Sequence, residues 1–260
     1  MLADFFLWMA GPAPPATVAL LSLFALAAGI SRGLTGFGAG MIFVPLAGGL
    51  VGPQQAVALI WTMDAPNMVP VAFGSARRAD WRESLWLFAG WLVSTPVGLW
   101  LLTRLDPLTV RWAVCILILC AMTLLIGGWS YRGRPSLALA IATGLVAGIT
   151  GGLAGLSGPP IVMLWLAAAM ATATNVRDNL NVFFLLTTVV NAVLLPAYGI
   201  LTWPALRLGL LLALPYGLGV YAGTLAFRAV SDRNYRRAAY FVIGGAALLA
   251  LPLMDRFLGR

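Results

Sequence analysis

The chain has 260 residues, of which 61% are hydrophobic and only 9% are charged. A soluble domain carries about 25% charged residues, so this composition excludes an ordinary soluble protein. The formal net charge is +8, yet the arginines are dispersed in short loops between apolar stretches. That distribution is typical of membrane proteins and does not predict a nucleic-acid partner.

Residue types needed for several kinds of chemistry are absent or badly placed. The sequence contains no histidine and no lysine, which excludes histidine-based triads, histidine zinc motifs, Schiff bases and a Walker-A loop. The two cysteines, Cys115 and Cys120, point in different directions on a helix and cannot share a metal. We therefore expect no metal, no cofactor and no enzymatic activity.

Ten apolar segments follow an interfacial N-terminal stretch, residues 1–15. They cover residues 16–34, 38–51, 54–74, 84–103, 109–129, 136–155, 159–172, 179–200, 204–227 and 237–254. Most approach the ~20 residues that a helix needs to cross a bilayer. The second and the seventh are short, and the sequence leaves open whether they span fully or re-enter.

The second half of the chain repeats the first. Residues 28–37 match residues 147–156, and further on Trp81 matches Trp203 and Pro96 matches Pro215. Each half holds five segments, and an odd number gives the halves opposite orientations. We therefore predict an all-α, polytopic membrane protein with two inverted-topology repeats, 16–129 and 136–254. A cytoplasmic linker, 130–135, joins them, and a tail, 255–260, follows.

The arginines give an orientation for this arrangement. When the 75–83 loop is placed in the cytoplasm, about twice as many arginines fall inside as outside. Corresponding loops in the two halves carry opposite charge bias, as inversion requires. Both termini are then predicted on the outer side of the membrane.

Two glycine-rich stretches, residues 35–40 and 155–160, interrupt the apolar segments. Ser157 stands just before two prolines, and a serine N-cap with proline in the first turn predicts a helix that starts near Pro159. A helix start presents unpaired N–H groups and about half a positive charge. Two such ends, brought together by inverted repeats, predict an anion site near the membrane midplane. The alternative is that the glycines only allow close helix packing.

The glycine runs at residues 33–40 and 155–160 resemble those of the sulfite exporter TauE/SafE family, and the likeness extends from about Thr17 to Pro252. The resemblance implies a permease for sulfite or an organic sulfonate in the bacterial cytoplasmic membrane, working by alternating access between the repeats. A passive anion channel and a transport-inactive assembly subunit are the alternatives. The expected partners are the anion and the lipid bilayer, and a homodimer is left open.

The residues expected to contact the substrate come from the two breaks and from three other positions. They are Thr35, Gly36, Phe37, Gly38, Ser157, Gly158, Asn67, Asn191 and Arg32. The two asparagines either donate hydrogen bonds to an oxyanion or hold helices together. Arg32 is either a clamp for the anion or a side chain that snorkels to the membrane surface.

Asp64 lies in the middle of an apolar segment, where a carboxylate is costly and is a functional candidate by default. We expect it to couple transport to protons. The alternatives are a hydrogen bond to the interrupted backbone near Pro66 or an ion pair with an arginine. Arg177 and Asp178 are expected to form a capped, ion-paired start to the eighth segment.

Overall fold

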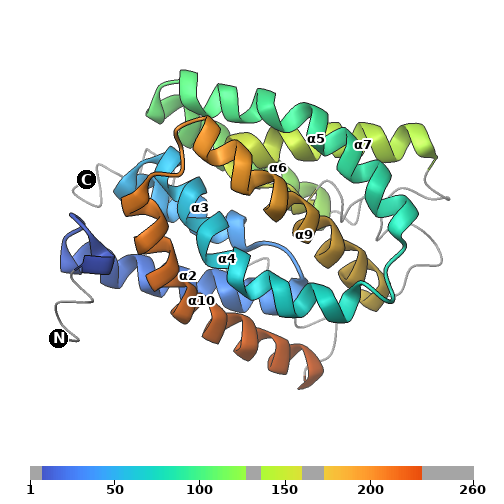
Figure 1. Ribbon diagram of the computed structural model, residues 1–260, viewed down its shortest axis with the longest axis horizontal. Helices are drawn as coiled ribbons and strands as arrows, with labels where there is room; N and C mark the ends of the chain where they lie inside the picture. The colour runs from blue at the N-terminus through green and yellow to red at the C-terminus, as the bar shows by residue number, and fades with distance from the viewer. Residues whose placement is uncertain (1–7, 127–135, 160–172, 230–260) are drawn as a thin grey trace.

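The computed structural model describes residues 8–126, 136–159 and 173–229, and these residues form helices without a strand (Figure 1). The helices are α2 (Pro15–Thr35), α3 (Ala39–Val51), α4 (Pro53–Ser75), α5 (Trp81–Arg104), α6 (Pro107–Ile126), α7 (Leu137–Ala154), α9 (Ala173–Ala197) and α10 (Trp203–Ala229). Seven of them are long and apolar enough to cross a membrane. The prediction of an all-helical, multi-pass membrane protein is confirmed for this part of the chain.

Seven of the ten predicted segments coincide with helices to within three residues, and α9 begins six residues before its predicted segment, 179–200. The predicted segment 237–254 and nearly all of segment 159–172 lie outside the described residues. The short second segment is α3, which has 13 residues. At 1.5 Å per residue it is about 20 Å long, which is less than the ~30 Å thickness of the hydrocarbon core.

Helix boundaries follow from local capping. α5 begins at Trp81, earlier than its apolar pattern indicates, because the side chain of Asp80 accepts hydrogen bonds from the backbone N–H groups of Arg82 and Glu83. Ser136 caps α7 in the same way through the N–H of Leu139. These caps satisfy donors that a helix start leaves without a partner.

Glycines allow two pairs of helices to pack at backbone contact. On α2, a Cβ added at Gly29 would lie 2.2 Å from the carbonyl oxygen of Tyr216 on α10. On α7, a Cβ added at Gly144 would lie 2.1 Å from the carbonyl oxygen of Leu87 on α5. The pairs α2–α10 and α5–α7 are the two most extensive helix contacts among the described residues. Small residues are therefore what bring these helices together.

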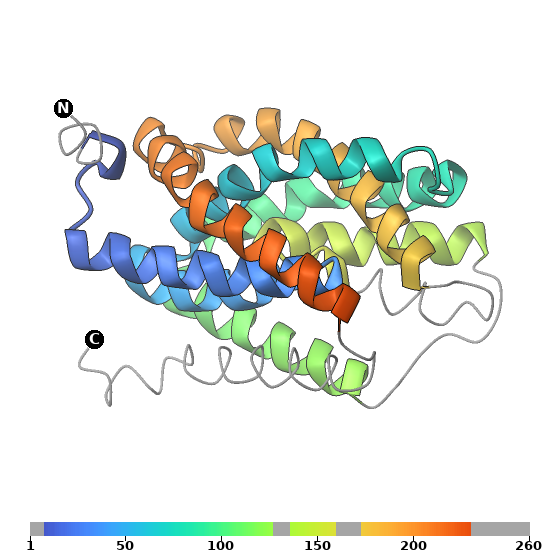
Figure 2. The same ribbon diagram turned by 90° about the horizontal axis from the view of Figure 1, so that it is seen from below.

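The remaining helices fill the space between the two pairs. Figures 1 and 2 show α2 beside α10 along one edge and α5 beside α7 along another. α4 packs against α10, α3 and α9, and α9 packs against α4 and α5. Large apolar side chains such as Val93, Val193 and Leu214 are exposed on the outside. A surface of this kind is suited to contact with lipid chains.

Candidate substrate site

The first break separates α2 from α3. α2 ends at Thr35, and the next residue, Gly36, has a left-handed backbone with φ of 77° and donates its N–H to the carbonyl oxygen of Arg32 at 2.8 Å. Gly38 has φ of 91° and precedes α3. Residues with a Cβ rarely adopt these angles, so both positions favour glycine. The Thr35 hydroxyl holds the break by accepting from the N–H of Phe37 at 3.1 Å.

The N-terminus of α3 faces a cavity. No side chain caps this helix, and its first turn contains no acidic residue. Gly38, Ala39 and Gly40 all line the cavity. A helix start of this kind offers main-chain N–H groups and a partial positive charge to whatever occupies the cavity.

The second break follows α7. α7 ends at Ala154, and Gly155 is left-handed with φ of 67° and donates its N–H to the carbonyl oxygen of Gly151 at 2.8 Å. Helical structure resumes at Gly158. The helix therefore restarts close to Pro159, as the sequence predicts.

The predicted N-cap role of Ser157 is wrong, however. A capping side chain accepts from the N–H of the second or third helical residue, and after Gly158 these are Pro159 and Pro160, which have no N–H. The Oγ of Ser157 accepts instead from the indole Nε1–H of Trp91 at 3.2 Å. Because an indole only donates, the hydroxyl proton of Ser157 is directed elsewhere.

The two breaks meet in the interior. A Cβ added at Gly40 would lie 2.4 Å from the carbonyl oxygen of Gly155, and one added at Gly158 would lie 2.9 Å from the Cβ of Phe37. Both breaks line one cavity of about 110 Å³. Since one water needs about 10–15 Å³ of such volume, this cavity has room for several waters or one small ion.

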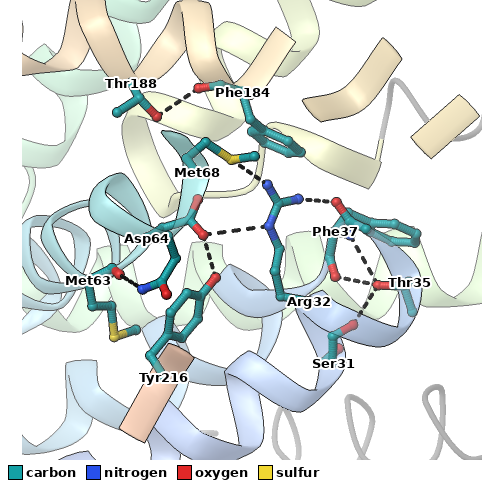
Figure 3. A network of polar contacts seen from close by, with 12 residues as sticks. Ser31, Arg32, Thr35, Phe37, Met63, Asp64, Met68, Phe184, Thr188 and Tyr216 are labelled. Carbon is teal, nitrogen blue, oxygen red and sulfur yellow. Dashed lines mark hydrogen bonds and ion pairs between the residues drawn. The ribbon is translucent and has the colours of Figure 1, made fainter. Parts of the chain in front are cut away.

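An ion pair forms part of the cavity wall (Figure 3). Arg32 Nε lies 3.6 Å from Asp64 Oδ1, and the same oxygen accepts a hydrogen bond from the Tyr216 hydroxyl at 2.6 Å. The guanidinium lies over the Phe184 ring, with 4.3 Å from its central carbon to the ring centroid. It also donates to the carbonyl oxygen of Gly36 and to the sulfur of Met68.

Arg32 does not snorkel, because its side chain is only 7% exposed and is surrounded by these groups. Of the alternatives for Asp64, the ion pair with an arginine is the one that the structure contains. A buried guanidinium requires a counter-charge or hydrogen bonds. Asp64 supplies the charge at a distance longer than a normal hydrogen bond.

The two asparagines lie in different surroundings. Asn191 lines the larger cavity, and its Oδ1 is buried with no hydrogen-bond partner. The amide of Asn67 donates to the carbonyl oxygens of Met63 at 2.9 Å and Ala213 at 3.4 Å. It therefore ties α4 to α10, and it lines a smaller neighbouring cavity of about 30 Å³, together with Gly36.

The larger cavity thus contains most of the predicted residues. Phe37, Gly38, Ser157, Gly158, Asn191, Arg32 and Asp64 line it, whereas Gly36 and Asn67 belong to the smaller cavity. Thr35 supports the break through its backbone hydrogen bonds. Trp91, Phe184 and Tyr216 could not be singled out from the sequence, because they look like ordinary apolar positions. Their contacts depend on which helices come together.

A second ion pair lies where α4 ends and α9 begins. Arg78 donates two hydrogen bonds to Asp178, at 2.7 and 3.1 Å, and Asp80 N–H donates to Asn179 Oδ1 at 2.7 Å. The hydrogen bond and the charge of Asp178 raise the pKa of Arg78. Asp178 is thus ion-paired near the start of α9, as expected, and a bidentate partner comes from the loop after α4. The side chain of Arg177 lies outside the described residues.

The helices and the buried, charged cavity define a multi-pass membrane protein with an internal polar site. The chain belongs to the sulfite exporter TauE/SafE family, whose sequence profile matches residues 21–250. It is therefore a membrane transporter by family and not an enzyme.

A curated relative covers almost the whole chain. The probable sulfite/organosulfonate exporter TauE of Cupriavidus necator is 28% identical over 256 residues, which cover 91% of this chain and 96% of the relative. No solved structure matches the chain.

Proposed function

We propose that the protein is a secondary transporter that moves sulfite or an organic sulfonate across the bacterial cytoplasmic membrane by alternating access. Membership of the TauE/SafE family and the similarity to a probable sulfite/organosulfonate exporter support this substrate class. The observation that carries the proposal is that two helix breaks from opposite halves of the chain line one internal cavity.

The inverted repeat is supported by the helix pairs. In the repeat inferred from the sequence, α2 corresponds to α7, and α5 corresponds to α10. The pair α2–α10 and the pair α5–α7 therefore each join the first helix of one half to the fourth helix of the other. This exchange gives the molecule two similar units, each built from both halves, and in the proposed mechanism one unit rocks against the other around the breaks.

In the proposed site the anion is held by several donors. The main-chain N–H groups at Gly38–Gly40 point to it from α3, and the Ser157 hydroxyl donates from the second break. Arg32 supplies the positive charge, and a planar guanidinium binds the oxygens of a sulfonate in a bidentate manner. The Asn191 amide is a further donor. Its Oδ1 has no hydrogen-bond partner, so the side chain can rotate and turn its NH₂ group toward the cavity without losing a hydrogen bond of that oxygen.

Asp64 is the proposed coupling residue. It lines both cavities and is the partner of Arg32. When an anion takes its place beside Arg32, the carboxylate loses its counter-ion, and uptake of a proton restores neutrality. The proposed orientation places the 75–83 loop in the cytoplasm and both termini in the periplasm, with repeats at residues 16–129 and 136–254.

Flux into proteoliposomes tests the transporter. We expect labelled sulfite or methanesulfonate to enter saturably, to compete with each other, and to accumulate against a gradient when a pH difference is imposed. An anion channel gives flux only down the gradient, and an assembly subunit gives none. Either result overturns the proposal. Empty liposomes and the Asp64→Asn variant, which we expect to lose accumulation, complete the comparison.

Orientation has a separate test. We expect cysteines introduced singly in the 75–83 and 200–207 loops of a Cys115→Ser, Cys120→Ser background to react with membrane-impermeant reagents from opposite sides. Reaction of both from the same side contradicts inversion.

A further inference from the structure

Arg32 is held by weaker partners than a buried guanidinium usually has. Its two nearest acceptors are the Gly36 carbonyl oxygen and the sulfur of Met68, which is 2.9 Å from its terminal nitrogen. A thioether sulfur is a weak acceptor, and the Phe184 ring contributes only a cation–π contact. The strongest acceptor nearby, Asp64, stands 3.6 Å away, beyond the 2.7–2.9 Å typical of charge-assisted hydrogen bonds.

Tyr216 explains this separation. Its hydroxyl donates to Asp64 Oδ1 at 2.6 Å, and Oδ1 is also the atom that faces Arg32 Nε (Figure 3). The tyrosine hydroxyl therefore occupies one lone pair of the oxygen that faces the guanidinium. Tyr216 is fully buried, and its backbone packs against Gly29 of α2. The hydroxyl is thus fixed by the same helix contact that fixes Arg32.

We propose that Tyr216 sets the affinity for the anion by holding Asp64 away from Arg32, so that the carboxylate neutralises the guanidinium without a direct hydrogen bond to it until an oxyanion arrives. This inference rests on the proposed function and adds a positioning residue to it. Tyr216 belongs to neither cavity lining, and it acts through Asp64. If Arg32 and Asp64 were directly hydrogen-bonded, those hydrogen bonds would have to be broken each time an anion binds. At the present separation of 3.6 Å, the anion only replaces Asp64 as the counter-ion of Arg32.

The charged and titratable groups around Asp64 come from two other helices. Arg32 faces it from α2 and Tyr216 from α10. From α9, the neighbouring side chains of Phe184 and Thr188 are uncharged. The position of the carboxylate is thus decided by one cation and one hydroxyl. The Thr188 hydroxyl donates to the carbonyl oxygen of Phe184 at 2.7 Å, so among these four residues only Arg32 is left to donate to Asp64 when the Tyr216 hydroxyl is removed.

The test is the affinity of the purified protein for sulfite and for methanesulfonate. Binding is measured by the change in tryptophan fluorescence, since Trp61 lines the cavity. Tyr216→Phe keeps the ring and removes the hydroxyl. We expect it to raise the Kd for either anion about tenfold, because Asp64 then forms a direct hydrogen-bonded pair with Arg32 that the anion must displace.

The decisive comparison repeats Tyr216→Phe in the Asp64→Asn background. An asparagine carries no charge to compete for Arg32, so here we expect no change in Kd. An equal loss in both backgrounds, or no loss in either, overturns the role of Tyr216. Tyr221→Phe is the matched control, because Tyr221 is on the same helix and is 67% exposed, and its Kd should match that of the unmodified protein.

The same experiment separates this inference from the proposed function. If the unmodified protein binds anions and Tyr216→Phe behaves identically to it, the transporter proposal stands and the role of Tyr216 falls. If the unmodified protein binds neither sulfite nor methanesulfonate, both fall. Thermal unfolding of every variant in detergent shows whether a change in Kd reflects loss of the folded protein.

Discussion

The first and second helix breaks begin with the same backbone turn but differ in chemistry. Each begins at a left-handed glycine, Gly36 in one and Gly155 in the other, and each helps to line the larger cavity. Beyond the break, however, the first half continues with Ala39 and Gly40, and the second with Gly158 and Pro159. The prolines remove main-chain donors that the first break keeps.

In the proposed site, the second break replaces those donors with a side chain. Ser157 accepts from Trp91, so its own proton is available to the cavity. The two breaks therefore share one left-handed turn, while in the proposed site one break offers amide donors and the other a hydroxyl. A repeat in the sequence thus predicts where a site lies better than it predicts which atoms bind the ligand.

The largest effect should come from the contact between the breaks. In Gly40→Ala, the new Cβ would lie 2.4 Å from the carbonyl oxygen of Gly155, and neither backbone can move far. We expect a loss of more than about 2 kcal/mol in stability, together with loss of flux. Thermal unfolding measures the loss of stability, and uptake of sulfite into proteoliposomes measures the loss of flux. Gly74→Ala is the control, since its Cβ meets nothing within 4 Å; equal behaviour of the two variants would contradict the close contact.

The hydroxyl of the second break should matter next. Ser157→Ala removes the proposed donor without enlarging any side chain. We expect the Kd for sulfite to rise at least tenfold, since a hydrogen bond to a charged group contributes about 1.5–3 kcal/mol. Ser22→Ala is the control, because that hydroxyl bonds only to Val18 within α2. An unchanged Kd in Ser157→Ala would contradict the proposed hydrogen bond from Ser157 to the anion.

A smaller effect should follow when Trp91 loses its N–H. Trp91→Phe keeps an aromatic ring beside Phe88 and Phe183 but frees the Ser157 hydroxyl to turn away from the cavity. We expect about a threefold rise in Kd, because orientation is lost and the donor remains. In the Ser157→Ala background the same substitution should change nothing. An equal rise in that background would show that the tryptophan acts by packing.

The smallest effect should come from making the first break resemble the second. Phe37 corresponds in the repeat to Leu156, and both line the cavity. Phe37→Leu keeps an apolar side chain and reduces its size. We expect unchanged flux of sulfite and a rise of about twofold in the flux of larger sulfonates. A pocket that is wider by about one methylene excludes the larger anions less strongly. The ratio of the two fluxes is measured by competition between sulfite and a longer alkanesulfonate. If this ratio is the same in Phe37→Leu and in the unmodified protein, Phe37 has no role in selectivity.

Much of the fold could be predicted because each element has a local signal. Apolar stretches gave the helices to within a few residues, and Gly36, Gly38 and Gly155 marked the breaks, because left-handed backbone favours glycine. Asp64 could be singled out because a carboxylate within an apolar helix is unfavourable without a partner. The assignment of Ser157 to a helix cap failed, although the two following prolines already excluded it.

The sequence alone therefore determined where the helices lie and where they stop. It also determined which few polar residues are unfavourable inside a membrane unless they have a partner. Those properties depend on a residue and its near neighbours. The tertiary structure alone decided that Asp64 faces Arg32 and Tyr216, that Trp91 reaches Ser157, and that Asp178 binds Arg78. Each of these contacts joins helices or loops far apart in the chain, and their meeting depends on how glycine-lined helix faces pack, which no local pattern encodes.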